Sequence, residues 1–228
     1  MARRIAIIED DEDLRENYSD VFRKQGYQVL GFQDRSEAEQ GLISRLPDLA
    51  IIDIGLGDEI DGGFALCQWL RQKSSTLPII FLSARDSDFD IVSGLRMGAD
   101  DYLTKDISMP HLIARVAALF RRINVMQETS TEEIIERGNL KMDGNRFLCT
   151  WDEHPIDLTL TEFWMIYALV KHIGHVKSRD QLMQESKIVV DDATITSHIK
   201  RIRKKFLEVN KQFDCIETVY GMGYRWVS

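Results

Sequence analysis

The first half of the chain alternates short apolar runs with longer stretches in which apolar residues recur at helical spacing. The runs predict strands at 4–8, 27–31, 48–52, 78–82 and 101–104, and the stretches between and after them predict helices at 12–25, 35–44, 63–74, 87–97 and 109–121. Five such strand–helix units predict an α/β doubly wound fold, which is a five-stranded parallel sheet with helices on both faces.

The alternation stops in a polar stretch at 124–136, which we interpret as a linker between domains 1–123 and 137–228. The second half shows short strand patterns, then helical patterns, then a glycine-rich hairpin, at 138–142, 146–151, 154–157, 161–173, 178–186, 192–208 and 214–227. A chain of 228 residues is long enough for two domains of about 100 residues each. The order of short strands, then helices, then a hairpin predicts an α+β fold for the second domain.

Polar side chains follow four of the predicted strands of the first domain. Glu9 and Asp10 follow the first strand, Asp53 follows the third, Ser83 the fourth and Lys105 the fifth. If these strands are parallel neighbours, one edge of the sheet collects three carboxylates, a hydroxyl and an ammonium, at the edge where open α/β sheets bind ligands. Carboxylates this close repel one another unless a cation lies among them, and the best candidate is Mg²⁺, which prefers oxygen ligands.

The net charge of −8 gives no reason to expect the whole protein to be attracted to nucleic acid. Residues 1–123 carry a net charge of −6 and the remainder −2, so any such binding must come from a local basic patch. The three cysteines have no metal-binding spacing and are interpreted as reduced core thiols. We see no signal peptide and no apolar stretch near the roughly 20 residues that span a bilayer, which predicts a cytoplasmic protein without membrane contact.

The predicted helix 192–208 carries a local basic patch, with five cations within 200–205. Ile195, Ile199, Ile202 and Phe206 form an apolar stripe that must face a core. The opposite face, predicted to meet solvent or a partner, carries Thr194, Ser197, His198, Arg201 and Lys204, flanked by Lys200, Arg203 and Lys205. Charge alone leaves two interpretations open, a phosphate-binding surface and an ordinary solvated basic face.

The first domain carries an acidic pair, a single aspartate, a hydroxyl, an aromatic ring and a lysine, which are Glu9 and Asp10, Asp53, Ser83, Tyr102 and Lys105. With these residues, 1–123 resembles the receiver domain of response regulators, which has a flavodoxin-like fold. The resemblance implies that Asp53 accepts a phosphoryl group, that Lys105 binds a phosphoryl oxygen, and that Ser83 and Tyr102 are switch residues. It also implies that Mg²⁺ is held by Glu9, Asp10, Asp53 and the backbone carbonyl of Gly55, with no organic cofactor. A sensor histidine kinase would be the donor, and the domain would catalyse only its own phosphorylation and slow dephosphorylation, so it is not expected to be a turnover enzyme.

Residues 137–228 resemble the winged helix-turn-helix effector domain of the OmpR/PhoB family. The landmarks match in order at 158–163, 178–182, 198–205 and 218–224. The resemblance implies a recognition helix at 192–208 in the major groove of double-stranded promoter DNA and a wing near 218–224. The implied DNA-binding residues are Thr194, Ser197, His198, Lys200, Arg201, Arg203, Lys204, Thr218, Tyr220 and Tyr224.

The same resemblance implies a phosphorylation-driven homodimer. Phosphorylation would draw Ser83 to the phosphate and turn Tyr102 inward, repacking the surface made by 87–97, 101–104 and 109–121. Across the dimer, Asp101 is expected to pair with Arg115, and Asp100 with a base such as Arg122.

Several positions depart from the family pattern. Gly57 replaces the usual proline and the loop reaching Asp61 is one residue longer, a feature that resembles a subgroup of proteobacterial sortase systems. Asp106 replaces a proline whose peptide bond is cis in the family, and Tyr220 replaces the usual wing arginine. The loop 184–192 is shorter than in most members of the family. Because this loop can contact RNA polymerase in the family, its shortness weakens the expectation of such a contact.

The sequence therefore predicts a response regulator whose Mg²⁺-dependent phosphorylation at Asp53 favours a dimer that binds promoter DNA and regulates transcription. The alternative is a DNA-binding transcription factor with an atypical receiver that acts independently of phosphorylation. A phosphotransfer enzyme such as a small phosphatase is disfavoured, because Gly55 leaves no general acid two residues after Asp53.

Overall fold

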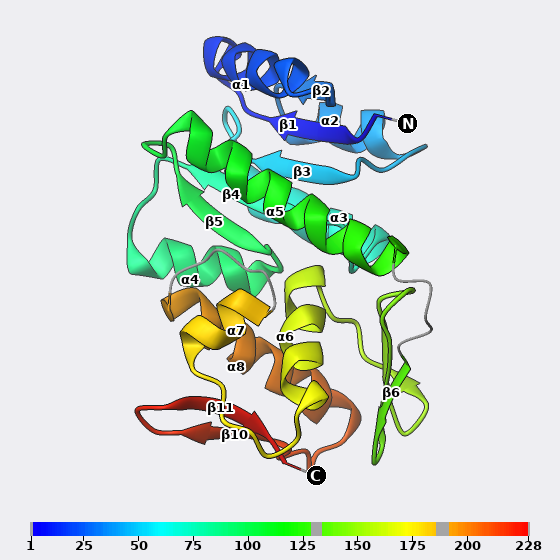
Figure 1. Cartoon of the computed structure of the whole chain (residues 1–228). Coiled ribbons are helices and arrows are strands. Elements are labelled where there is room, and N and C mark those ends of the chain that lie inside the picture. The colour runs from blue at the N-terminus through cyan, green and yellow to red at the C-terminus, as the bar shows by residue number, and fades with distance from the viewer. Residues whose placement is uncertain (1, 129–133, 186–191, 228) are drawn as a thin grey trace. The chain divides into compact units, whose positions relative to one another are not determined.

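The structure is a computed structural model, and it describes residues 2–128, 134–185 and 192–227 (Figure 1). The chain divides into two compact units, residues 1–116 and 117–228, and each is described by itself. Among the described residues, no helix is long and apolar enough to cross a membrane.

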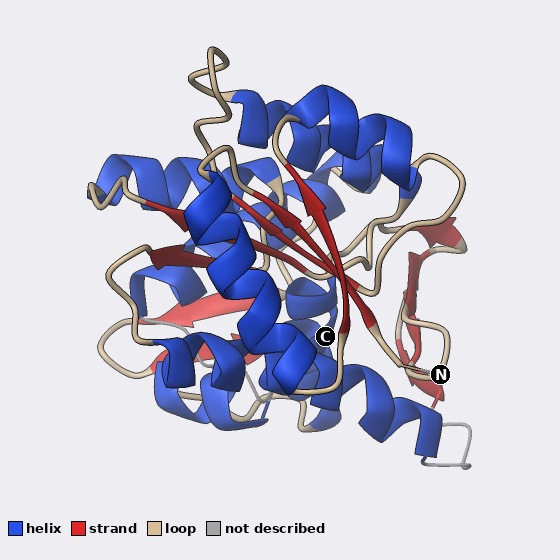
Figure 2. Cartoon of the chain, turned by 90° about the horizontal axis from the view of Figure 1, so that it is seen from above, coloured by secondary structure: helices blue, strands red, loops and turns tan. Residues whose placement is uncertain are grey.

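The first unit is built on a parallel sheet with the strand order β2-β1-β3-β4-β5. Its strands are β1 (Arg4–Ile8), β2 (Gln28–Phe32), β3 (Leu49–Ile52), β4 (Ile79–Ser83) and β5 (Asp101–Thr104). Its helices are α1 (Glu12–Lys24), α2 (Arg35–Leu42), α3 (Gly62–Lys73), α4 (Asp88–Met97) and the first part of α5 (Met109–Glu128). The predicted doubly wound sheet is confirmed, and Figure 2 shows the strands lying between helices.

The apolar runs of the sequence are short and unbroken because the central strands are covered on both faces. Every residue of β3 and β4 is buried. Alternate strand residues, among them Ala50, Ile52 and Phe81, join one hydrophobic cluster with residues of α2, α3 and α4. This packing fixes the strands in register, so that their carboxyl ends meet at one edge of the sheet.

The second unit contains an antiparallel sheet, three helices and a terminal hairpin, as predicted. The sheet is formed by β6 (Ile134–Arg137), β7 (Leu140–Asp143), β8 (Leu148–Trp151) and β9 (His154–Pro155). The helices are α6 (Leu160–Lys171), α7 (Arg179–Glu185) and α8 (Asp192–Val209), and the hairpin is β10 (Ile216–Val219) with β11 (Gly223–Trp226).

Aromatic rings hold the second unit together. Trp151 of β8, Phe206 of α8, Phe213 and Trp226 of β11 pack mutually, with ring centroids 4.4–6.3 Å apart. The cluster joins the antiparallel sheet to the carboxyl end of α8 and to the hairpin. Each of these rings removes a large apolar area from water, so the cluster fixes α8 against the rest of the second unit.

Two elements differ from the sequence predictions. Helix α5 continues to Glu128, past its predicted end at 121, and β6 includes residues 134–136 of the stretch interpreted as a linker. That interpretation used polarity and the loss of alternation, but most polar residues have helix propensities within about 0.7 kcal/mol of alanine, so polarity by itself does not end a helix, and the strong helix breakers are glycine and proline. Residues 122–128 contain neither.

Candidate functional site

The carboxyl ends of β1, β3, β4 and β5 bring together the side chains that the sequence placed at strand ends. The backbone N–H of Asp53 donates to the carbonyl of Ile8 (2.9 Å), and that of Lys105 donates to the carbonyl of Ser83 (2.9 Å). The sheet hydrogen bonding thus continues one residue past the strands. As a result, the functional side chains are carried on backbone that the sheet holds rigid.

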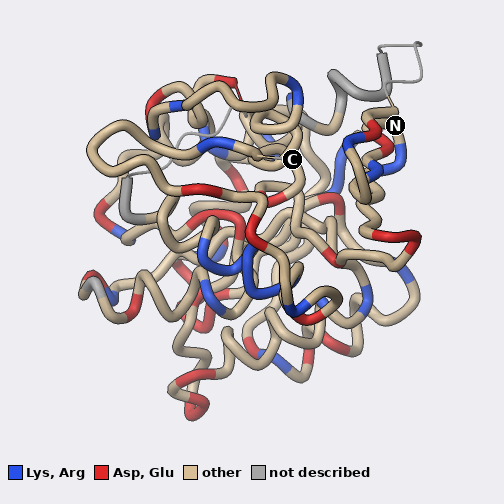
Figure 3. The backbone as a smooth tube through the Cα atoms, turned by 90° about the horizontal axis from the view of Figure 1, so that it is seen from below, with Lys and Arg blue, Asp and Glu red and all other residues tan. Residues whose placement is uncertain are grey.

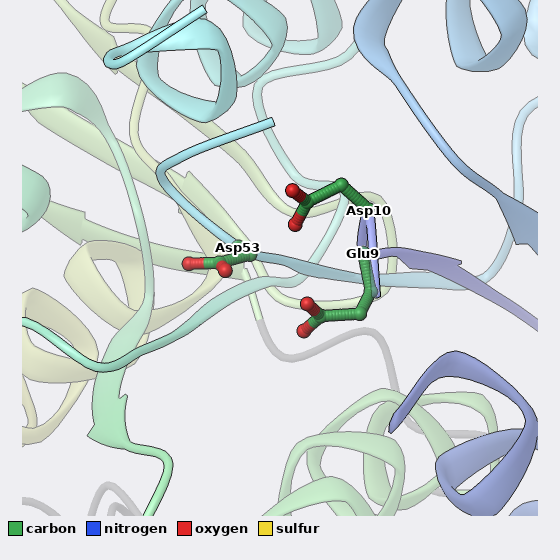
Figure 4. Close-up of side chains that lie close together, drawn as sticks. All are labelled: Glu9, Asp10 and Asp53. Atoms are coloured by element: carbon green, nitrogen blue, oxygen red, sulfur yellow. The ribbon is translucent and has the colours of Figure 1, made fainter. Parts of the chain in front are cut away.

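Three carboxylates gather at this edge. One ligand oxygen from each of Glu9, Asp10 and Asp53 lies within 4.8 Å of the others (Figure 4). Glu9 is 2% exposed and Asp53 is 9% exposed, whereas Asp10 is exposed. Because all the donors are hard oxygens and one side of the group is open to solvent, the chemistry of the set fits a divalent cation such as Mg²⁺.

Lys105 is the cation of this site. Its ammonium donates to Oδ2 of Asp53 (2.6 Å) and to Oε1 of Glu9 (2.8 Å). Burial alone would lower the pKa of Lys105, but the two carboxylates raise it above its ordinary value, so the group stays charged. Burial raises the pKa of Glu9, and the nearby lysine offsets only part of that effect. The Lys105–Asp106 peptide bond is trans, and the contacts of the lysine with Glu9 and Asp53 show that it reaches the site with Asp106 after it.

The loop after β3 folds back on itself beside the acidic group. Leu56 and Glu59 exchange backbone hydrogen bonds of 3.0 and 3.1 Å, and the N–H of Gly57 donates to Oδ2 of Asp10 (3.2 Å). Gly57 has φ +60°, which a proline could not adopt.

Two further glycines lie close to Asp53. Gly55 is half-buried two residues after Asp53. At Gly63, a Cβ atom would lie 2.0 Å from the carbonyl oxygen of Asp53, so the start of α3 approaches the site as only glycine permits.

Ser83 and Tyr102 lie together beside the acidic group. Ser83 is 2% exposed and Tyr102 is 8% exposed, and the Tyr102 hydroxyl donates to the carbonyl of Arg85 (2.8 Å). Burial and the nearby Asp90 carboxylate raise the pKa of Tyr102 to about 12. Gly94 of α4 leaves room for the ring, since a Cβ there would lie 2.7 Å from it. The inward position expected to follow phosphorylation is therefore already present in the unmodified chain.

The charges predicted to pair across a dimer have other partners. Asp100 is 1% exposed, bound to Arg71 of α3 (2.8 Å) and to the N–H of Ile79 (3.0 Å). The prediction that Asp100 is available to a second chain is wrong, because its carboxylate is buried within its own chain. Asp101 contacts Arg115 of the same chain at 3.3 Å. Arg122 lies outside the described side chains.

The predicted solvent face of α8 is partly wrong. Thr194 is 3% exposed, His198 is fully buried, and the Arg201 side chain is 10% exposed. Arg201 and Lys205 form ion pairs with Glu162 of α6, which is completely buried. The buried arc of α8 is wider than its apolar stripe because α6 and α7 both pack on the helix.

The exposed part of α8 faces a groove against the hairpin. Thr196, Lys200 and Lys204 are exposed, and Ser197 and Arg203 are half-buried. The groove has a volume of about 340 Å³ and is lined by Arg179, Thr196, Lys200, Arg203, Thr218, Val219, Tyr220, Gly221, Gly223 and Tyr224. The lining of the groove has three basic residues, Arg179, Lys200 and Arg203, and no acidic one, whereas Figure 3 shows both signs of charge dispersed along the chain. The sequence reasoning missed Arg179 and Thr196, although Thr196 begins a second stripe with Lys200, Arg203 and Leu207, one residue after the apolar one.

Tyr224 organises the groove from below. It is 3% exposed, the guanidinium groups of Arg179 and Arg203 lie 6.0 and 5.9 Å from its ring centre, and its hydroxyl donates to Thr196 (3.3 Å). Arg203 also donates to the carbonyl of Ile216 and to the hydroxyl of Thr218 (2.8 Å). The tip of the hairpin is open, with Tyr220 94% exposed and Met222 60% exposed.

Comparison with known proteins supports both halves of this picture. The response regulator receiver domain matches residues 5–117, and the C-terminal domain of transcriptional regulatory proteins matches residues 153–226. The chain is 35% identical to the phosphate regulon transcriptional regulatory protein PhoB of Escherichia coli, over 99% of this chain and 98% of that protein. It is 32% identical to the alkaline phosphatase synthesis transcriptional regulatory protein PhoP of Bacillus subtilis, over 99% and 97%.

Solved structures resemble the chain along its whole length. The response regulator DrrB of Thermotoga maritima, an OmpR/PhoB homologue, is 25% identical with a TM-score of 0.52 and full coverage of both chains. A mutant of RitR is 24% identical with a TM-score of 0.76, covering 99% of each chain, and this likeness concerns the fold alone.

Proposed function

Because the chain belongs to the OmpR/PhoB family of two-component response regulators, with a receiver domain and a DNA-binding transcriptional regulatory domain, we propose that phosphorylation of Asp53 controls its binding to promoter DNA. The observation that carries the proposal is the contact of Lys105 with both Asp53 and Glu9 at the edge of the sheet. We propose a receiver domain at 1–123 and a DNA-binding domain that begins with β6 at 134, ahead of the limit 137 predicted from the sequence, because β6 pairs with β7.

The chemistry requires one carboxylate oxygen of Asp53 to attack the phosphorus atom of a phosphodonor, so that an O–P bond forms while the bond between phosphorus and the donor breaks and the donor leaves with that electron pair. Its Oδ1 accepts from the N–H of Ile54 (2.6 Å) and its Oδ2 from Lys105, so the carboxylate is fixed in orientation. Lys105 is placed to pass from Oδ2 to a phosphoryl oxygen as the new bond forms. Glu9, Asp10, Asp53 and the carbonyl of Gly55 would hold Mg²⁺, which supplies positive charge to the transferring group. The protein would modify only itself, and so would not turn over substrate as an enzyme.

The partner that supplies the phosphoryl group is proposed to be a sensor histidine kinase in the cytoplasm. An acyl phosphate carries a charge of about −1.5 to −2 beside Ser83 and Lys105, in place of the single negative charge of the Asp53 carboxylate. The change would bias the surface of α4, β5 and α5 towards a homodimer, with Asp101 and Arg115 exchanging their internal contact for one between chains. Contact with RNA polymerase would involve the loop at 184–192, of which residues 186–191 lie outside the described residues.

The DNA-binding surface is proposed to be the groove between α8 and the hairpin. Lys200, Lys204 and Arg203 would contact phosphates, with Thr196 and Ser197 facing the major groove. Thr218 and Tyr220 would contact the backbone or minor groove from the wing. Thr194, His198, Arg201 and Tyr224 would act from beneath this surface, by holding α8 and the wing in place.

A phosphodonor experiment tests the proposal. Intact mass is measured for wild type and Asp53→Asn after incubation with acetyl phosphate, with Mg²⁺ or with excess EDTA. We expect an adduct of about 80 Da on wild type with Mg²⁺ only. An adduct on Asp53→Asn, or none on folded wild type, would contradict the assignment.

The inward Tyr102 favours a second candidate function, a regulator that binds DNA without phosphorylation. If the unmodified receiver already has its switch residues in the position of the active state, the phosphate has less to change. The two functions differ in one observable, which is the ratio of DNA affinities with and without phosphate on Asp53.

A further inference from the structure

Arg85 contacts both switch residues through its main chain. It follows β4 by two residues, and its backbone N–H donates to the hydroxyl of Ser83 (3.4 Å). Its carbonyl accepts the hydroxyl of Tyr102 (2.8 Å). The position of the Arg85 backbone therefore decides where the Tyr102 hydroxyl finds its hydrogen-bond partner.

The side chain of Arg85 reaches a different part of the receiver. Its guanidinium contacts Asp61 (3.0 Å) and the carbonyl of Ile60, both in the loop after β3, and lies 3.7 Å from Asp90 of α4. The Arg85 side chain is 30% exposed and that of Asp61 is 65% exposed. This loop follows Asp53 directly and its Gly57 N–H donates to Asp10, so it lies against the acidic group that contains the phosphoacceptor.

A second arginine holds the same loop from its other side. Arg35, at the start of α2, donates to both carboxylate oxygens of Glu59 (2.7 and 3.1 Å). Its other ion pair is with Glu39 of its own helix. The loop thus has two ionic clamps, and within the part of the chain that the structure describes only the Arg85 clamp also touches the switch residues.

We propose that Arg85 is a positioning residue that links the loop after β3 to Tyr102, holding Tyr102 inward for as long as its guanidinium is bound to Asp61 and Ile60. The proposal rests on the proposed phosphorylation of Asp53 for its functional meaning, because movement of that loop would then reach the dimer surface through Arg85. Its structural content, the dependence of Tyr102 on the clamp, does not require phosphorylation.

The expected effect is modest because the clamp is partly exposed. Loss of an exposed ion pair shifts a two-state population by up to about fivefold, which corresponds to about 1 kcal/mol. Tyr102 is 8% exposed, so even a small outward population should raise its reactivity with solvent. Tyr18, which is 3% exposed in the same unit, supplies an internal reference for general loosening of the fold.

The experiment is hydroxyl-radical footprinting of the unphosphorylated full-length chain, read by mass spectrometry at the peptides that contain Tyr102 and Tyr18. The variants are Asp61→Asn and Arg85→Gln, which break the clamp, and Arg85→Lys, which keeps its charge. Glu59→Gln is the matched control, because it breaks the other clamp of the same loop.

We expect oxidation at Tyr102 to rise up to about fivefold in Asp61→Asn and Arg85→Gln, and to stay near wild type in Arg85→Lys and Glu59→Gln, with Tyr18 unchanged throughout. An unchanged Tyr102 in both clamp variants would overturn the proposal, as would an equal rise in Glu59→Gln. The same samples are given acetyl phosphate and weighed, so that failure of phosphorylation at Asp53 is seen separately from failure of the clamp.

Discussion

Replacing Glu162 by glutamine should destabilise the DNA-binding unit and flatten its response to acid. The Glu162 carboxylate is fully buried at the third position of α6, where it accepts from the N–H of Thr159 (2.7 Å) and completes a capping box. It is also the counter-ion of Arg201 and of Lys205 (2.6 Å) on α8. Glu162→Gln keeps the shape and removes the charge, which leaves both cations without their partner.

The size of the effect follows from the pKa of Glu162. Burial by itself would raise that pKa, but Arg201 and Lys205 lower it from 4.5 to about 2. A lowered pKa in the folded state stabilises the protein above the unfolded value and ceases to do so as pH falls through the folded value. The difference corresponds to about 3 kcal/mol at neutral pH, of which about 2 kcal/mol is lost by pH 3. Removing one partner of a buried ion pair costs about 3–5 kcal/mol, which agrees.

The assay is urea unfolding of the full chain at pH 7 and at pH 3, followed by tryptophan fluorescence. Trp151, Trp164 and Trp226 lie in the second unit, so a Trp69→Phe background makes the signal specific for it. The matched control is Glu217→Gln, which breaks the exposed pair with Arg225 and should cost at most about 1 kcal/mol. The reasoning is refuted if Glu162→Gln costs no more than this control at pH 7. It is also refuted if the free energy of unfolding of Glu162→Gln falls between pH 7 and pH 3 by as much as that of the wild type.

Four further substitutions separate surface roles from buried ones. Lys200→Ala should reduce the slope of log affinity for DNA against log salt concentration by about 0.9, and a slope equal to that of the wild type would contradict the assignment. Arg201→Ala should instead mainly lower the free energy of unfolding measured in urea. Gly94→Ala should destabilise the receiver by about 1–3 kcal/mol, measured by circular dichroism in urea, because the added methyl group meets the Tyr102 ring. Tyr220→Arg should steepen the salt slope by about 0.9 without changing stability, since the side chain is 94% exposed; an unchanged slope would remove the wing tip from the DNA-binding surface.

The receiver site could be predicted from the sequence because neighbouring parallel strands end at the same edge of a sheet. Residues that follow different strands along the chain therefore lie together at that edge. Glu9, Asp53 and Lys105 each follow an apolar run by a residue or two, and the sheet register then places them within hydrogen-bonding distance. The apolar pattern also located β3 within one residue of its start at Leu49.

The face of α8 was less accessible, because a helical stripe fixes only the middle of the buried arc. His198 and Arg201 lie beside that stripe and are buried where α6 and α7 pack on α8, and the counter-charge of Arg201 comes from Glu162 of α6, 39 residues away. The partner of Asp100 is Arg71, 29 residues away. Contacts of this kind depend on how elements pack, which local periodicity does not encode.

The most direct measurement is the affinity for DNA of wild type and Asp53→Asn, each with and without acetyl phosphate and Mg²⁺, on sequences selected from a random library by the phosphorylated protein. Salt concentration is held fixed, since phosphate contacts make affinity depend on it. The account predicts that phosphorylation raises the affinity of wild type by at least about tenfold, or about 1.4 kcal/mol, and leaves Asp53→Asn unchanged. Equal, tight binding by unphosphorylated and phosphorylated wild type would contradict it and establish a regulator that acts without the phosphate.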